Sequence, residues 1–529
     1  MAQMKTPGVY IVEKSAFPNS VVEAPTAIPA FIGITEKAQN GADSLSGKPW
    51  KITSMTEFQQ YFGGAPAPEF KLTVTDKPKK GIFYSIPSLN GKSTLSVEAP
   101  DKFFSLYYHM VMFFANGGGT CYIVSAGTYA EGNAIDKEKV IAALTALKKE
   151  QEITMVVVPE AASTSDCKDI QTQVLAHCGE MMNRFALLDV QPKAADNEPM
   201  SEQIEKFRTN VGANYLSYGA VYYPWLNTSV LSDKDIDGSV LTWDYTQGEI
   251  DLTPFFAAGS KVPAYFNEMF GKIKEGMAPA TPAGEKAESE EGSGGQTGTA
   301  TALTPDELAA MKNNLHNALL QNFPGYRYIV DKVRERLNLL PPSAAMAGLY
   351  TMVDNTRGVW KAPANVSVNF VNAPTENIDN AMQEDLNMPM NGKAVNAIRT
   401  FPGEGIKVWG ARTLDGNSQD WRYVNVRRTM MFLEESVKNA AKAYVFEPNV
   451  AATWMNVRSM IDNFLRSVWK RGGLAGATPE DAYEIHVGLG DTMTSNDILD
   501  GIMRITVLVA ITRPAEFIEI TFQQQMQKS

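Results

Sequence analysis

Three short, continuous apolar runs, set among helical patterns, do most to restrict how this chain can fold. The runs are residues 154–158, 185–190 and 219–225. Such runs are typical of strands that are buried on both faces of a sheet. Helical patterns over residues 137–150 and 169–184 precede the first two runs. Strands that alternate with helices predict an α/β layer in the middle of the chain.

The length and charge of the chain limit its organisation and its partners. A single core rarely grows beyond roughly 250–300 residues, so a chain of 529 residues predicts several domains. The net charge of −11 argues against a general nucleic-acid-binding protein, which would carry a basic balance. We therefore expect a multidomain protein of the α+β or α/β class that binds no nucleic acid.

Cysteine content and hydropathy indicate the cellular compartment in which the chain folds. Cys121, Cys167 and Cys178 are odd in number and lack CxxC spacing, so neither a disulfide framework nor a zinc site is expected. This usage fits folding in a reducing cytosol. Met1–Pro7 contains no apolar signal region, and no run approaches the roughly 18 apolar residues that span a bilayer. We expect no direct insertion into a membrane.

Motifs of catalysis and nucleotide binding are missing from the sequence. It contains no GxSxG, HExxH or Walker pattern. Gly117–Gly119 follows a helical pattern and precedes a strand, whereas a phosphate-binding loop needs the reverse order. The histidines belong to no catalytic signature; they are His109, His177, His316 and His486. We therefore expect no catalytic, cofactor-binding or metal-binding residues and no cofactor. A deep pocket with converging polar groups within residues 130–225 would favour an α/β enzyme instead.

Two long amphipathic helices are predicted near the C-terminus. Met430, Leu433 and Val437 lie on one face of the first helix, and Pro448 ends the pattern. In the second helix Arg458 and Arg466 lie opposite the apolar face, and the last turn carries Lys470 and Arg471. Strand patterns follow over residues 483–487 and 504–511.

Each end of the chain carries a β-prone run that stands apart from other strands. The first lies behind Pro7-Gly8 and consists of Val9, Tyr10, Ile11 and Val12. The second lies beyond Pro514 and includes Phe517, Ile518, Glu519 and Ile520. An isolated strand cannot satisfy its own backbone, so each run must pair elsewhere. From the residues alone, pairing within the same chain and pairing with another chain both remain open.

Two blocks of the sequence look like additions to a simpler core. Residues 66–100 are rich in Pro, Lys and Thr, and residues 228–275 shift to short polar and aromatic runs. Residues 278–303 are of low complexity and too poor in apolar side chains to offset ordering entropy, so we predict a disordered surface loop.

Several stretches resemble contractile tail sheath proteins of phages and related bacterial injection machines. They are Pro7-Gly8-Val9-Tyr10, residues 341–350, residues 354–365, Arg399–Thr413 and Trp421–Arg428. The resemblance implies hexameric rings that stack into a helical tube of identical subunits around an inner tube protein. It also implies baseplate and tail terminator proteins as partners, and assembly in the cytoplasm of a bacterial host. Contraction of such a sheath would drive the tube through a target envelope.

The resemblance implies a division of the chain and a use for both ends. Val9–Val12 and Phe517–Ile520 would exchange strands between subunits. Arg458, Arg466, Lys470 and Arg471 are candidates for contact with the tube or a neighbour, although a solvated helix face is the simpler explanation. A static filament or shell protein is the alternative to a contractile one. The expected division is an N-terminal arm joining the C-terminal core (1–25), an α/β middle domain (26–227 with 304–365), an outer insertion (228–303), a C-terminal sheath core (366–513) and a C-terminal arm (514–529).

Overall fold

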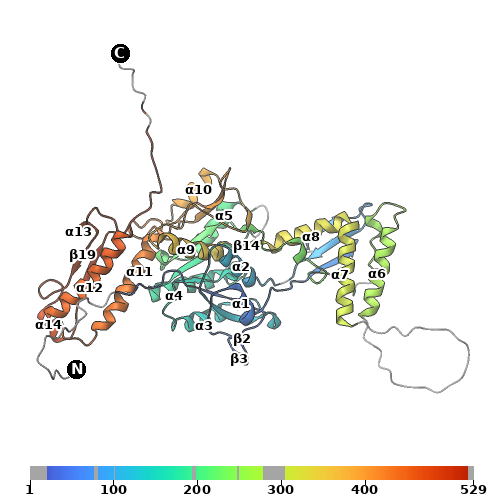
Figure 1. Ribbon diagram of the computed structural model, residues 1–529. Coiled ribbons are helices and arrows are strands. Elements are labelled where there is room, and N and C mark those ends of the chain that lie inside the picture. The colour runs from blue at the N-terminus through green and yellow to red at the C-terminus, as the bar shows by residue number, and fades with distance from the viewer. Residues whose placement is uncertain are drawn as a thin grey trace, which may run out of the picture.

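The computed structural model describes residues 21–521 and 523, except residues 77–81, 101, 194–197, 247–249 and 278–303. The described chain is elongated and has three parts (Figure 1). A sheet with helices on both faces lies in the middle. Helices α6 to α8 lie at one end and α11 to α14 at the other. The run Val9–Val12 and the predicted loop 278–303 lie outside the described residues.

The central sheet confirms the predicted α/β architecture. It has nine strands in the order β15-β18-β17-β11-β10-β9-β1-β8-β4. The six strands from β17 to β8 in this order run parallel. At the margins, β4 pairs antiparallel with β8, β18 with β17, and β15 with β18. The bounds are β1 Pro29–Thr35, β4 Trp50–Ile52, β8 Cys121–Thr128, β9 Met155–Val157, β10 Phe185–Asp189, β11 Gly219–Tyr223, β15 Val366–Ser367, β17 Asn396–Phe401 and β18 Gly405–Val408.

Helices cover both faces of this sheet because its strands are apolar on both sides. Phe31 and Ile123 face one hydrophobic cluster, while Ile32 and Val124 face the other. The first cluster is covered by α1 (Met55–Phe62), α2 (Leu106–Ala115) and α9 (Ser343–Arg357). The second is covered by α3 (Lys137–Leu147), α4 (Cys167–Met181), α5 (Met200–Asn210) and α10 (Asn380–Asn387).

An outer domain is built from both predicted additions and from two further helices. Its four-stranded sheet has the order β13-β5-β7-β6. The division expected from the sequence placed residues 304–337 with the middle domain. Leu319 and Val333 are instead buried in the hydrophobic cluster of this outer sheet. The elements are β5 Phe70–Thr75, β6 Ile82–Pro87, β7 Thr94–Glu98, β13 Leu241–Trp243, α6 Val262–Gly276, α7 Pro305–Asn322 and α8 Pro324–Leu337. A separate three-stranded sheet consists of β12 (Leu226–Thr228), β14 (Leu339–Leu340) and β16 (Val371–Pro374).

The C-terminal domain consists of two long helices and a hairpin. Phe432, Ile461, Phe464 and Ile485 lie together in one buried cluster. The central sheet crosses the boundary expected at residue 366, because Tyr222 in β11 pairs with a residue of β17. The separate C-terminal unit therefore begins near the start of α11. Its elements are α11 Val424–Ala441, α12 Ala451–Lys470, α13 Pro479–Ala482, β19 Tyr483–His486, α14 Ser495–Leu499 and β20 Thr506–Val509.

Candidate assembly site: an open hairpin and a clamped arm

The hairpin of the C-terminal domain has room for further strands. β19 and β20 pair antiparallel, with Tyr483 opposite Val509 and His486 opposite Thr506. The described residues supply no third strand to this sheet. A two-stranded sheet is marginal by itself in water, and a strand at an edge presents unpaired backbone groups. Leu508 of β20 is 53% exposed. The hairpin can therefore accept a strand from outside the protomer.

The C-terminal arm, residues 514–521, leaves the domain without pairing to it. It forms neither a helix nor a strand, and Figure 1 shows the chain running away from the body. Phe517, Ile518 and Ile520 are 72%, 79% and 70% exposed. Apolar side chains so placed bury nothing within their own chain. The arm is suited to pairing with another chain, and strand exchange by these residues stays a prediction.

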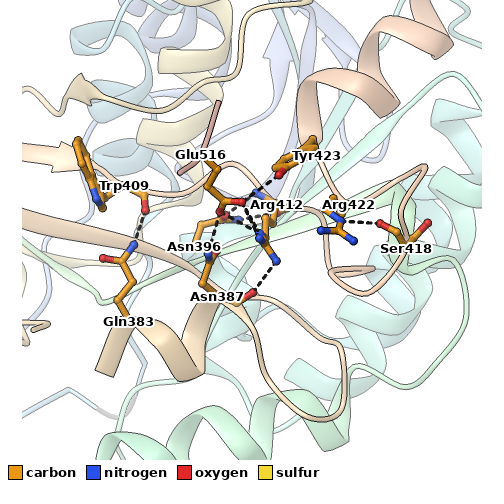
Figure 2. Close-up of polar contacts among 9 residues, drawn as sticks. All are labelled: Gln383, Asn387, Asn396, Trp409, Arg412, Ser418, Arg422, Tyr423 and Glu516. Carbon is orange, nitrogen blue, oxygen red and sulfur yellow. Dashed lines mark hydrogen bonds and ion pairs between the residues drawn. The ribbon is translucent and has the colours of Figure 1, made fainter. Parts of the chain in front are cut away.

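A polar clamp holds the root of this arm (Figure 2). The Glu516 carboxylate accepts hydrogen bonds from Arg412 Nε at 3.0 Å and from Arg412 Nη2 at 2.6 Å. Asn387 Nδ2 donates to Glu516 Oε1 at 2.8 Å, and the Tyr423 hydroxyl donates to Oε2 at 3.1 Å. The Arg412 side chain is only 3% exposed. Charge-assisted bonds of this fork geometry are among the strongest available to side chains.

The backbone beneath the clamp is fixed by a buried asparagine. Asn396 Oδ1 accepts the Arg412 N–H at 2.7 Å, and its Nδ2 donates to the Arg412 carbonyl at 2.8 Å. Arg412 Nη1 also donates to the Asn387 carbonyl oxygen at 3.1 Å. Gly410 permits this arrangement, since a Cβ there would lie 2.8 Å from Asn396 Oδ1. The sequence Trp409-Gly410-Ala411-Arg412 therefore positions the Arg412 side chain against the arm.

Replacing Gly410 by alanine should test the close approach of the Gly410 backbone to the Asn396 side chain. We expect Gly410→Ala to destabilise the protomer by about 1–3 kcal/mol, because Asn396 must move and its bonds to Arg412 weaken. Urea unfolding followed by tryptophan fluorescence measures the change. Gly403→Ala is not a matched control, because Gly403 has a φ of +78°. Gly119→Ala is suitable, since its Cβ would have no atom within 4 Å. Equal stability of both variants would contradict the account.

The clamp should persist in mild acid and open at lower pH. Burial alone would raise the pKa of Glu516, but hydrogen bonds from Arg412 and Asn387 outweigh it and hold the pKa below the ordinary value of 4.5. A carboxyl with a lowered folded-state pKa stabilises the clamp above the unfolded pKa and loses that effect as pH falls through the folded pKa. A nitroxide label on the exposed Ala515→Cys should therefore stay immobilised down to pH 4.5 and become mobile below it. Release of the label already between pH 7 and 5 would contradict this assignment.

The start of the described chain is tied to the C-terminal helices in a similar way. Ala24 donates its N–H to Ser436 Oγ of α11 at 2.9 Å. Glu23 forms an ion pair with Arg471 at the end of α12, and the Arg471 guanidinium lies over the Trp360 ring, 5.2 Å from its centroid. The described chain therefore begins against the C-terminal domain, which also carries the open hairpin.

The four basic candidates on α12 do not form one group. Arg471 pairs with Glu23, and Arg466 lies 3.5 Å from Asp462. Arg458 and Lys470 are exposed. Contact of any of them with a tube or a neighbour stays a prediction. Sequence reasoning missed the Arg412–Glu516 pair, although an acidic residue two positions after Pro514 was a signal that could have suggested a tether.

The edge of the central sheet where ligands usually bind is occupied by the chain itself. Open α/β sheets bind ligands at the carboxyl ends of strands where the strand order reverses, here between β1 and β9. Glu160 follows β9, and its carboxylate accepts N–H groups from Ser105 at 2.8 Å, Leu106 at 3.2 Å and Ile34 at 2.8 Å. Burial raises the pKa of Glu160 to about 7. The start of α2, a natural anion site, is thus already capped.

A cavity of about 280 Å³ does lie within residues 130–225, where a pocket would favour an α/β enzyme. Several polar residues of its lining are paired internally: Lys206 contacts Glu198 at 2.5 Å, and Gln171 and Gln203 donate to backbone carbonyls. Among the described residues, no group of three or more His, Cys, Asp or Glu could hold a metal ion. None of the described helices is both long enough and apolar enough to cross a membrane.

Comparison with known sequences points to one family. A family model for the phage tail sheath C-terminal domain matches residues 417–525. The tail sheath protein of Vibrio phage KVP40 is 25% identical over 210 residues, which are 38% of this chain and 29% of that protein. The tail sheath protein of Salmonella phage ViI is 25% identical over 183 residues, which are 34% of this chain and 28% of that protein. The matched region thus spans less than a third of these two relatives.

Comparison with solved structures extends the likeness to the whole chain. The sheath of an extracellular contractile injection system, PVC, in its contracted state is 26% identical, with a TM-score of 0.58 and 99% of both chains covered. The helical sheath of the anti-feeding prophage in its contracted state is 25% identical, with a TM-score of 0.58, and the match covers 99% of this chain and 100% of that one. Residues 417–525 thus match the phage tail sheath C-terminal domain, and the whole chain is similar to the sheaths of contractile injection systems.

Proposed function

We propose that this protein is the structural subunit of a contractile sheath, assembled as stacked hexameric rings around an inner tube. One observation carries the proposal: the same protomer has both an open two-stranded hairpin and an apolar arm that pairs with nothing in its own chain among the described residues. An arm from one copy adds a strand to the hairpin of another, which is β-augmentation. Each main-chain hydrogen bond gained contributes about 0.5–1.5 kcal/mol, so several strands per subunit hold a lattice together.

Contraction in this proposal is a change of packing between protomers. The bodies rotate and repack while the arms keep neighbours connected, and no nucleotide is consumed. The inner tube, baseplate and terminator are its partners, and assembly takes place in the cytoplasm of the bacterial host. Baseplate association has support in the likeness to a chain of the anti-feeding prophage baseplate, which is 25% identical with a TM-score of 0.57.

Electron microscopy of the purified protein tests the proposal. Negative-stain images should show hollow tubes, and preparations from particles should contain tubes of two lengths with different diameters. Tubes of one length only would favour a static filament or shell. Solitary globules at high protein concentration would contradict the proposal.

A further inference from the structure

The exposure of the C-terminal segment changes abruptly at one residue. Pro514 and Glu516 are half-buried, whereas every described residue from Phe517 onward is exposed. Upstream, the Thr512 hydroxyl donates to the Gly472 carbonyl at 2.9 Å. Beneath the arm an open groove of about 1090 Å³ remains, so packing does not hold residues 514–518 in place. The hydrogen bonds to Glu516 hold these residues in place.

The clamp joins the arm to the central body and not to the C-terminal domain. Asn387 belongs to α10, and Arg412 is fixed through Asn396 of β17. Tyr423 precedes the first residue of α11 and forms an isolated bridge with Arg412. A force on the arm is therefore delivered to the nine-stranded sheet, the most extensive element of the protomer.

We infer that Glu516 is the pivot of the C-terminal arm, a positioning residue that fixes how far the arm reaches and passes motion of the body to the neighbour. This inference rests on the proposed function. Residues 517–529 beyond the pivot span at most about 45 Å when fully extended. Without the clamp the fixed point recedes to Thr512, which adds residues 513–516 and roughly 14 Å of slack. With that slack, one protomer rotates before it pulls the next.

The mobility of a nitroxide label on Ala515→Cys in the full-length soluble protomer tests the pivot itself, because Ala515 is exposed and the three native cysteines are buried. Glu516→Ala should abolish the immobilised component of the label's spectrum, and Glu516→Gln should reduce it by less because the amide keeps one acceptor. Arg513→Gln is the matched control, since Arg513 is exposed in the same segment and lies 3.8 Å from Asp420. The control should give the spectrum of the labelled protein without it. Equal label mobility with Glu516 and with Glu516→Ala would overturn the inference.

Contraction of assembled particles tests the consequence. Glu516→Ala sheaths should form, and a larger share should stop at partial contraction, whereas Arg513→Gln sheaths should contract fully. Complete contraction of Glu516→Ala sheaths would overturn the transmission of motion by the clamp. If the wild-type chain forms no tubes, the proposed function fails, while the spin-label experiment still decides whether Glu516 holds the arm.

Discussion

Removal of residues 517–529 should give a protomer that is as stable as the full-length chain and forms no tubes. The described residues among them, 517–521 and 523, make no strand within the protomer, and their apolar side chains are exposed. Their loss exposes no core. The cut is placed after Glu516 because a cut at 514 would leave the buried Arg412 guanidinium without its carboxylate. Sedimentation velocity and negative-stain images measure assembly, and urea unfolding measures stability.

An internal deletion provides the control for this truncation. Residues 278–303 are predicted from their composition to be a surface loop, so replacing them with a short Gly-Ser linker should leave tube formation intact. Deletion of residues 1–14 should act like the C-terminal truncation, since the predicted strand Val9–Val12 is lost. Normal tubes from the 517–529 truncation would show that the arm does not join subunits.

Breaking the buried ion pair between Arg428 and Asp354 should have the largest effect on stability. Arg428 Nη1 and Nη2 contact the two carboxylate oxygens of Asp354 at 2.9 Å and 2.6 Å, and the side chains are 3% and 1% exposed. Arg428 Nη2 also donates to the Thr26 carbonyl oxygen at 2.8 Å. Arg428→Met leaves Asp354 buried without its partner, which costs about 3–5 kcal/mol. We expect a poorly soluble protomer with a strongly lowered urea midpoint.

An exposed arginine in the same domain gives the comparison. Arg504 lies 3.1 Å from Asp497, and its side chain is 57% exposed. Arg504→Gln should therefore change stability by only about 0–1 kcal/mol. Similar urea midpoints for Arg428→Met and Arg504→Gln would mean that the buried pair does not join α11 to the body.

Local patterns in the sequence were sufficient for the elements but not for all their neighbours. The mostly apolar run 185–190 was predicted as a buried strand, and its residues Phe185–Asp189 form one in the sheet. The helix Pro305–Asn322 begins at the capping pattern Thr304-Pro305-Asp306-Glu307, but its sequence does not say which sheet its apolar face covers. The clamp joins Arg412 to Glu516 across 104 positions of sequence, and no local pattern encodes such a distance.

A cryo-EM reconstruction of the assembled protein tests the central claim most directly. We predict a β-strand from the C-terminal arm of one copy, including Phe517–Ile520, hydrogen-bonded beside β19 and β20 of another copy. The Arg412–Glu516 pair should be closed in the copy that supplies the arm. A reconstruction in which each hairpin keeps only its own two strands, with every arm folded onto its own protomer, would contradict the account.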